Sequence, residues 1–351
     1  MIKRKKTKIV NIGGVKIGGN FPIAVQSMTN TPTWDIKKTL RQIKKLEKAG
    51  CEIIRVGVPD LKSARALSKI KKQIKIPLVA DIHFSSELAL ESIQQGADKI
   101  RINPGNFPQK DIKKIVSLAQ KKKIPIRIGI NSGSLEKDLL EKYHRASAKA
   151  MVESALRSVR RMEKLGFYNL VVSLKAPDVL RTVEAYEILS RKIDYPLHLG
   201  VTEAGGVFSG TLKSAIALGS LLLKGIGDTL RVSLSADPVE EVRAGWEILK
   251  SLELRQRGVK IVSCPTCARA TLDVIGLSQK TERITRTIKK PLRIAVMGCV
   301  VNGLGEGRES DLAIVGAGKL ALVMRKGKII SRAPEKQAFE VFKKELRKIS
   351  Q

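Results

Sequence analysis

Short apolar segments alternate with longer amphipathic segments over the first two thirds of the chain. The apolar segments are rich in Val, Ile and Leu and are short, which predicts β-strands. These strands are expected at residues 21–29, 52–58, 77–83, 99–103, 125–131, 170–176, 196–203 and 228–234. Each is followed by a segment like residues 37–50, whose apolar side chains recur every three or four positions, and several such segments end at glycine. This spacing predicts a helix after each strand.

Eight strand–helix units within about 250 residues match the number and the length of a (β/α)8 barrel. The alternative is a doubly wound open sheet, which rarely needs eight consecutive units. We therefore predict an α/β fold whose first domain, residues 1–256, is a TIM barrel that binds the substrate. The connection after the fifth strand is long, and we interpret residues 132–149 as a segment that covers the substrate at the barrel rim.

The pattern changes near residue 257, and no long linker marks the change. Residues 257–351 predict a small α+β domain. Its strands are expected at residues 260–263, 292–298 and 311–316 and in a hairpin over 319–331, with helices that begin at 271 and near 335.

The chain is strongly basic, with 66 Lys+Arg against 33 Asp+Glu and a formal net charge of +33. Such a charge favours a nucleic-acid or membrane partner. However, many of the lysines fall on polar faces or ends of predicted helices, and only 4% of the residues are aromatic, which leaves little for base stacking. We predict no nucleic-acid partner and no membrane partner. Because the N-terminus lacks a signal peptide's apolar core and no stretch is long enough to span a membrane, we expect a cytoplasmic protein.

Polar side chains gather at the carboxyl ends of the predicted strands, which in a barrel point toward one mouth. A single arginine there is most simply explained by a rim ion pair. Several cations on different buried strands are costly without an anion, and Asp81 and Glu203 are too few to neutralise them. We infer a phosphate or diphosphate ligand. The strand-end residues are Arg55, Asp81, His83, Arg101, Asn103, Arg127, Asn131, Ser173, Lys175, His198, Glu203, Arg231 and Ser233.

Two further features of these strand ends leave alternatives open. The stretches "NPGN" (103–106), "NSGS" (131–134) and "EAGG" (203–206) fit loops whose backbone N–H groups face an anion, although turns use the same residues. His198 fits a buried core histidine as well as a side chain at the mouth.

Three of the four cysteines suggest a metal centre in the second domain. Cys264 and Cys267 form a CxxC pair, and Cys299 follows the strand that ends near 298, whereas Cys51 is interpreted as a small buried residue. A closed zinc site needs four Cys or His ligands, and residues 259–351 contain no histidine. An iron–sulfur cluster with one exchangeable position is therefore favoured over zinc. Glu306 or Glu309 is the candidate fourth ligand, and the surrounding glycines predict a flexible turn that lets the glutamate fold back.

Motifs along nearly the whole chain occur in an order that identifies a family. They are "PIAVQSMTNT" (22–31), "IPLVADIHF" (76–84), "RINPGN" (101–106), "IPIRIGINSGSLEKDL" (124–139), "PLHLGVTEAGG" (196–206), "GIGDTLRVSLSADPVEEV" (225–242), "CPTC" (264–267) and "GCVVNGLGE" (298–306). In these motifs the chain resembles the bacterial-type 4-hydroxy-3-methylbut-2-enyl diphosphate synthases of the non-mevalonate isoprenoid pathway. Leu304 stands where that family usually has proline.

The resemblance implies a role for individual residues. A [4Fe-4S] cluster would be held by Cys264, Cys267, Cys299 and Glu306. The diphosphate would be bound by Arg55, Arg101, Arg127, Lys175 and Ser233. Catalysis at the reacting carbons would involve Asp81, Asn131, His198 and Glu203, with Glu203 managing protons and Glu306 giving way to a substrate oxygen.

The resemblance also implies a reaction and partners. The reaction is the two-electron reductive dehydroxylation and ring opening of 2-C-methyl-D-erythritol 2,4-cyclodiphosphate to (E)-4-hydroxy-3-methylbut-2-enyl diphosphate. The electron donor would be flavodoxin or ferredoxin, both of them acidic. The family works as a head-to-tail homodimer in which one chain's cluster closes the other chain's barrel. Two other classes remain as alternatives: a zinc-stabilised RNA-associated protein, and a pterin-type barrel enzyme acting on another diphosphate.

Overall fold

The computed structural model describes residues 2–351 and divides the chain into two compact units, Met1–Arg255 and Gln256–Gln351. Each unit has its own hydrophobic core and is described by itself. Within the described residues, none of the helices has the length and apolar character needed to cross a membrane.

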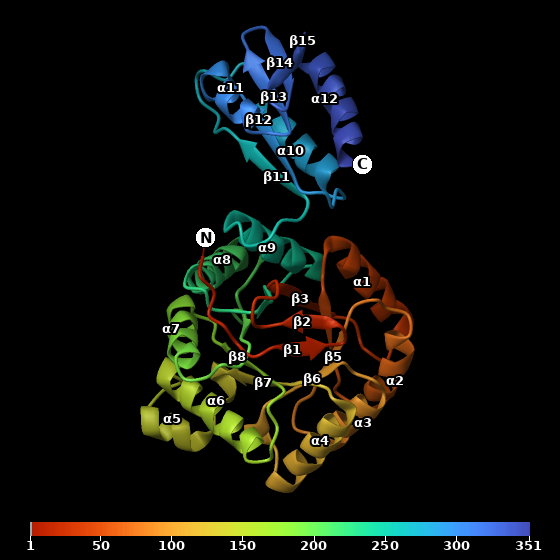
Figure 1. Cartoon of the computed structure of the whole chain (residues 1–351), viewed down its shortest axis with the longest axis vertical. Helices are drawn as coiled ribbons and strands as arrows, with labels where there is room; N and C mark the ends of the chain where they lie inside the picture. The colour runs from red at the N-terminus through yellow and green to blue at the C-terminus, as the bar shows by residue number, and fades with distance from the viewer. Residues whose placement is uncertain (1) are drawn as a thin grey trace. The chain divides into compact units, whose positions relative to one another are not determined.

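The first unit is a TIM barrel, which confirms the predicted fold class (Figure 1). Eight parallel strands lie in the order β8-β7-β6-β5-β4-β3-β10-β9, and a bridge between Val172 and Leu197 brings the two edges together. The strands are β3 (Ala24–Met28), β4 (Ile53–Gly57), β5 (Leu78–Asp81), β6 (Lys99–Ile102), β7 (Ile126–Asn131), β8 (Leu170–Lys175), β9 (His198–Leu199) and β10 (Thr229–Leu230). All eight fall inside the segments that the apolar pattern predicts.

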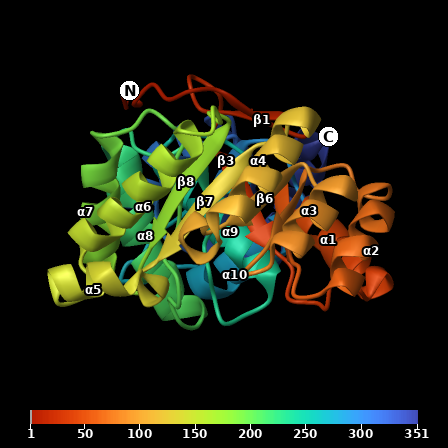
Figure 2. The same ribbon diagram turned by 90° about the horizontal axis from the view of Figure 1, so that it is seen from below.

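Helices surround the barrel, as Figure 2 shows around β6, β7 and β8. The main ones are α1 (Ile36–Ala49), α2 (Leu61–Lys71), α3 (Ser86–Gln94), α4 (Gln109–Lys122), α6 (Ala148–Glu163), α7 (Val179–Ser190), α8 (Val207–Leu223) and α9 (Pro238–Ser251). The long connection after β7 holds the short helices η2 (Ser132–Ser134) and α5 (Lys137–Tyr143), and η1 (Pro104–Asn106) follows β6. Apolar side chains of strands and helices form one continuous core between the two layers.

An N-terminal hairpin that the sequence pattern did not indicate closes the amino end of the barrel. Strands β1 (Val10–Ile12) and β2 (Val15–Ile17) pair antiparallel. Their buried side chains pack with the lowest inward-facing residues of the barrel strands, Ala24, Ile53, Val79 and Val171. With that end filled, the barrel interior opens only toward the carboxyl ends of its strands.

The second unit is a five-stranded mixed sheet in the order β11-β12-β13-β14-β15. Its strands are β11 (Val259–Ser263), β12 (Leu292–Met297), β13 (Leu312–Ala317), β14 (Leu320–Arg325) and β15 (Lys328–Ala333). Helices α10 (Val274–Thr285) and α12 (Glu335–Ser350) pack on one face of the sheet, and α11 (Val300–Arg308) packs on the other. This is the small α+β arrangement that the sequence predicts.

Candidate functional site

A polar pocket lies at the carboxyl ends of the barrel strands, and we call it the mouth pocket. Strand residues two apart point to the same side, so the inward positions of each strand follow one another toward the mouth. Seven of the eight strands, β4 to β10, or the segments just after them contribute. The lining residues are Arg55, Asp81, His83, Arg101, Arg127, Asn131, Ser173, Lys175, Thr202, Arg231 and Ser233.

Asp81 is the anionic centre of this pocket. Its carboxylate lies 3.8 Å from Nε of Arg55 and 3.3 Å from Nη1 of Arg101. Burial alone would raise the pKa of Asp81, but the charge of Arg55, the His83 side chain and the charge of Arg101 together hold it well below its usual value. Asp81 is therefore ionised at neutral pH and acts as a hydrogen-bond acceptor, not as a proton donor.

The cations of the mouth pocket outnumber its carboxylates. Nε and Nη1 of Arg127 are buried without a hydrogen-bond partner within residues 2–351, and the residue is only 1% exposed. Burial, followed by the charges of Arg55 and Arg101, lowers the pKa of Arg127 well below its usual value. Burial and the charge of Arg127 do the same to the pKa of Lys175. A multivalent anion in the pocket would relieve this repulsion and accept the free N–H groups.

Two glycines make room for these long cations. A Cβ atom at Gly129 would lie 2.2 Å from Nε of Arg101, and one at Gly200 would lie 2.5 Å from Nζ of Lys175. Both distances are shorter than any real contact of this kind. Gly129 on β7 and Gly200 after β9 therefore let guanidinium and ammonium groups run against the backbone of the neighbouring strand.

The structure brings together most of the predicted barrel residues. All five residues predicted to bind diphosphate line the mouth pocket, and so do Asp81 and Asn131. His198 does not: it is fully buried in the layer of Thr229 and Ala24, and its Nδ1 lies 2.8 Å from Oγ1 of Thr229. Glu203 also lies outside the lining. It is exposed just after β9 with a φ of 53°, a backbone conformation that is uncommon for a non-glycine residue.

Two further charged side chains of the barrel, Lys99 and Glu241, were not predicted from the sequence. Lys99 is fully buried inside the barrel, and its Nζ has no partner in the part of the chain that the structure describes. Its position two residues before Arg101 on the same strand could have indicated it. The Glu241 carboxylate on α9 accepts hydrogen bonds from Nη2 of Arg231 at 3.0 Å and from Oγ of Ser27 at 3.1 Å. It thereby holds Arg231 at the pocket, a tertiary contact that no local pattern signals.

Two of the three cysteines of the second unit, Cys264 and Cys299, lie at the carboxyl ends of neighbouring strands. Cys264 directly follows β11, Cys299 is the N-cap of α11 after β12, and these two strands are parallel neighbours. The backbone N–H of Gly298 donates to Sγ of Cys264 at 3.0 Å, which ties the two cysteine segments together. All three thiols are free, and Cys267 is exposed. Thiols on neighbouring strand ends suit an iron–sulfur cluster in donor chemistry.

Glu306 does not join these cysteines in the structure. Residues 300–308 form the helix α11, so the predicted flexible turn was wrong. Gly303 and Gly307 bring this helix close to the sheet: a Cβ atom there would lie 2.3 Å from Val315 and 2.6 Å from Sδ of Met324. Leu304 extends the helix, because leucine keeps the backbone N–H that proline lacks.

The Glu306 carboxylate is instead paired with Arg293 of β12, 2.8 Å from Nη2. Glu309, the alternative ligand, pairs with the same nitrogen at 3.2 Å. Over residues 2–351, no three His, Cys, Asp or Glu side chains converge closely enough to hold a metal ion. The three thiols therefore suit a cluster in donor chemistry but are not gathered around one point in this structure, and a fourth ligand from α11 requires the ion pair with Arg293 to open.

Both units match models of one protein family. Residues 7–246 match the GcpE TIM-barrel domain, and residues 260–348 match the GcpE protein C-terminal domain.

Curated relatives are similar over their full length. A protein of Caldanaerobacter subterraneus subsp. tengcongensis is 57% identical, with 99% of each chain covered. One of Geobacillus thermodenitrificans is 51% identical over 100% of this chain and 94% of its own. One of Thermodesulfovibrio yellowstonii is 51% identical over 99% of this chain and 100% of its own. All three are named 4-hydroxy-3-methylbut-2-en-1-yl diphosphate synthase (flavodoxin).

Two solved structures of dihydropteroate synthase are similar to this chain over about 70% of its length. Dihydropteroate synthase from Stenotrophomonas maltophilia superimposes with a TM-score of 0.52 at 13% identity, covering 70% of this chain and 98% of that chain. The Yersinia pestis enzyme gives a TM-score of 0.50 at 14% identity, with the same coverage. At this identity the similarity concerns the fold and carries no statement about the reaction.

Proposed function

The chain belongs to the GcpE family, and on that basis we propose that it is a 4-hydroxy-3-methylbut-2-en-1-yl diphosphate synthase of the flavodoxin-dependent type. It reduces 2-C-methyl-D-erythritol 2,4-cyclodiphosphate with two electrons and two protons. The bond between carbon and the ring phosphate oxygen breaks, a hydroxyl group leaves as water, and 4-hydroxy-3-methylbut-2-enyl diphosphate remains.

The excess of buried cations in the mouth pocket is the observation that supports this substrate class. We propose that the diphosphate oxygens accept hydrogen bonds from Arg55, Arg101, Arg127, Lys175 and Ser233; in support, all five residues line this one pocket. Arginine pairs with phosphate through two parallel hydrogen bonds, whereas lysine supplies a point charge. Ionised Asp81 would accept a hydrogen bond from a substrate hydroxyl, and the amide of Asn131 lines the same pocket.

Glu203 is the proposed proton donor at the pocket rim. Asp81 cannot fill that role, because its pKa is held far below neutrality. The Glu203 carboxyl is exposed to solvent just after β9, next to Thr202 of the mouth pocket, where it can reach both water and a bound substrate. We propose that His198 acts from beneath the pocket by positioning the residues above it. Burial and the charge of Arg127 lower the pKa of His198 well below its usual value, so its imidazole is neutral.

The electrons require a redox group that the mouth pocket does not contain. We propose that Cys264, Cys267, Cys299 and Glu306 hold a [4Fe-4S] cluster. Such a cluster, when bound, supplies single electrons and an iron position open to substrate. Free thiols of this kind persist in a reducing compartment, which supports the cytoplasm as the location. We propose flavodoxin as the donor, with ferredoxin as the alternative.

An anaerobic turnover assay tests the proposed function directly. We expect the protein, purified without oxygen, to be brown, to contain iron and sulfide, and to convert the cyclic diphosphate when reduced flavodoxin or reduced methyl viologen is supplied. A colourless preparation with one zinc ion per chain and no turnover would contradict the proposal and favour a structural zinc site. Turnover with another diphosphate but not with the cyclic one would favour a different barrel enzyme.

We further propose a head-to-tail homodimer in which one chain's cluster domain serves the partner's barrel. The proposal predicts complementation between two inactive variants. Arg127→Met disables the barrel, and Cys299→Ala disables the cluster. In a mixed dimer, the intact cluster of one chain meets the intact barrel of the other, so about one of the two sites works. We therefore expect about a quarter of the wild-type turnover if the chains mix at random, and about half if all dimers are mixed. Mixtures that stay inactive, although mass spectrometry detects mixed dimers, would contradict the head-to-tail arrangement.

A further inference from the structure

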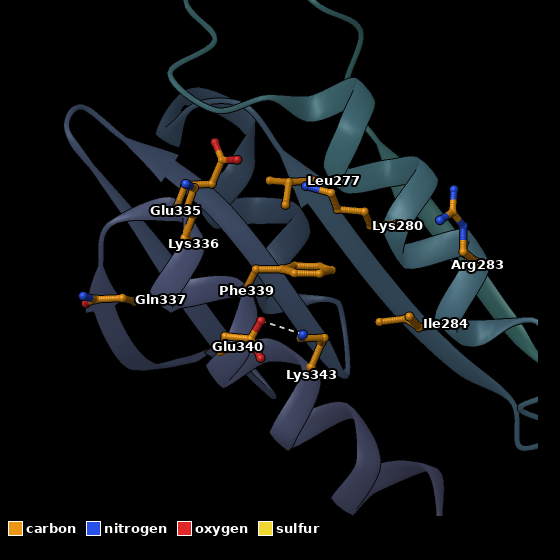
Figure 3. Close-up of a pocket in the computed structure, with 10 residues that line it drawn as sticks. All are labelled: Leu277, Lys280, Arg283, Ile284, Glu335, Lys336, Gln337, Phe339, Glu340 and Lys343. Atoms are coloured by element: carbon orange, nitrogen blue, oxygen red, sulfur yellow. Dashed lines mark ion pairs between the residues drawn. The ribbon is translucent and has the colours of Figure 1, made fainter.

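A groove runs between helices α10 and α12 of the second unit, and we call it the α10–α12 groove (Figure 3). It encloses about 620 Å³ and lies on the sheet face opposite α11. Its lining residues are Leu277, Lys280, Arg283, Ile284, Glu335, Lys336, Gln337, Phe339, Glu340 and Lys343. The site described above uses none of them.

The floor of the groove is apolar. Phe339 projects from α12 toward Leu277 of α10 in Figure 3, and Ile284 closes the far end. Phe339 is fixed from behind by Phe342, with ring centroids 5.7 Å apart and planes 12° from parallel. Although half-buried, Phe339 keeps part of its ring open to the groove. A rigid aromatic side chain in such a position is typical of the centre of a protein interface.

The walls of the groove are basic. Four cations line it, and its two carboxylates are already engaged: Glu340 pairs with Lys343 at 2.6 Å, and Glu335 accepts the backbone N–H of Asp273 at 3.0 Å. The exposed Lys280, Arg283 and Lys336 have no ion-pair partner within the described residues. Residues 256–351 as a whole carry 20 Lys+Arg against 8 Asp+Glu. An acidic surface is therefore the complementary partner.

The groove begins close to the cysteines. The backbone N–H of Thr271 donates to the carbonyl of Gly298 at 2.8 Å, immediately before Cys299. A Cβ atom at Gly298 would lie 2.9 Å from Cγ2 of Val274, the first residue of α10. Leu277 follows Val274 by one helical turn, a rise of about 5 Å. A protein seated in the groove would thus lie next to the segment that carries Cys299.

We propose that the α10–α12 groove is the docking surface for the reduced flavodoxin that delivers the electrons, an inference that rests on the proposed function. Flavodoxins are acidic and carry their flavin near the surface. Electron-transfer encounters are small and transient, so a short apolar patch flanked by unpaired cations suffices for them. The cations raise the rate of encounter, and Phe339 provides apolar contact once the partner has arrived.

The test compares two double variants of the cluster-loaded enzyme with the same change in charge. Lys280→Glu/Lys336→Glu reverses two cations of the groove. Lys319→Glu/Lys328→Glu reverses two exposed lysines of the same unit that do not line the groove, one in the turn before β14 and one at the start of β15. For the groove variant we expect kcat/KM for reduced flavodoxin to fall about tenfold or more at low salt and to lose most of its dependence on ionic strength. Turnover with reduced methyl viologen and the iron content should stay within twofold of wild type.

Direct binding separates this inference from the proposed function. Calorimetry with oxidised flavodoxin needs no turnover, and the groove variant should bind at least about tenfold more weakly than the control variant. Equal dissociation constants for the two variants would overturn the docking surface, even if the enzyme is active. If the wild type showed no turnover with reduced methyl viologen, the proposed function would be overturned. The binding comparison could still be interpreted, because calorimetry does not depend on turnover. Two other results would also overturn the inference, provided that the groove variant binds flavodoxin as tightly as the control variant does. A change in its oligomeric state would assign the groove to a second copy of the chain, and a loss of co-purified RNA would assign it to RNA.

Discussion

Replacing Arg127 by methionine is expected to weaken substrate binding strongly and at the same time to make the free protein more stable. Arg127 is 1% exposed, and two of its guanidinium nitrogens have no partner in the described structure. An unpaired buried cation destabilises the fold, so an apolar side chain of similar length should raise the free energy of unfolding by about 1–3 kcal/mol. The loss of a bidentate phosphate contact should weaken diphosphate binding by about 100-fold or more. Thermal unfolding with and without the cyclic diphosphate measures both effects.

Arg101→Met provides the matched comparison. Arg101 lies on the neighbouring strand at the same level, but it donates to Asp81 at 3.3 Å and to the carbonyl of Gly129 at 3.1 Å. Its removal leaves Asp81 with fewer partners, so the free protein should lose about 1–3 kcal/mol of stability. Both variants should lose the thermal shift that the substrate induces. The inference that Arg127 is unpaired in the free protein and pairs only with a bound anion would be wrong if Arg127→Met destabilised the free protein as much as Arg101→Met.

Cys299→Ala is expected to remove the iron and to lower turnover by a factor of about 1000 or more. The reason is that the cluster would lose one of its three thiolate ligands and would no longer be retained by the protein. Cys299 is only partly buried and caps α11 without a side-chain hydrogen bond, so the fold of the second unit should survive. Iron and sulfide analysis with the visible spectrum gives the first readout, and far-ultraviolet circular dichroism gives the second.

Two further variants make this result specific. Cys51→Ala is the control for the loss of a thiol: Cys51 is buried in the barrel core, burial raises its pKa to about 12, and its removal should leave iron and turnover unchanged. Glu306→Ala should retain the three thiolates and part of the iron. Arg293→Met breaks the ion pair but keeps the carboxylate, so it should resemble the wild type. If Arg293→Met and Glu306→Ala lost iron equally, the carboxylate would act through the ion pair and not as a ligand.

The repeating pattern of short strands and amphipathic helices was sufficient to predict the architecture. Each helix must bury its apolar face against a strand that is close to it in the sequence. Eight strand–helix units in the sequence therefore predict eight strand–helix units in the fold. The N-terminal hairpin escaped because strands of three residues leave almost no pattern, and their partners at the amino end of the barrel are distant in sequence.

The cations of the mouth pocket were predictable for a similar reason. Arg55, Arg101, Arg127 and Lys175 stand at inward positions near the carboxyl ends of parallel strands, and barrel geometry sends such positions to one place. Which of them are neutralised was not predictable. That depends on Asp81 pairing with Arg55 and Arg101 but not with Arg127, and on Glu241 of the following helix, α9, pairing with Arg231.

The residues around Glu306 show where local reasoning fails. Three glycines after Cys299 predicted a flexible turn, because glycine adopts many backbone conformations. In the tertiary structure two of them lie where α11 touches β13 and β14, at distances that exclude a Cβ atom, so packing against the sheet makes the segment a helix. The sequence by itself therefore determined the strand–helix repeats, the chemistry gathered at the strand ends and the thiol donors. Only the tertiary structure decided which charges are paired, because ion pairs and close packing join residues whose separation along the chain carries no information about their distance in space.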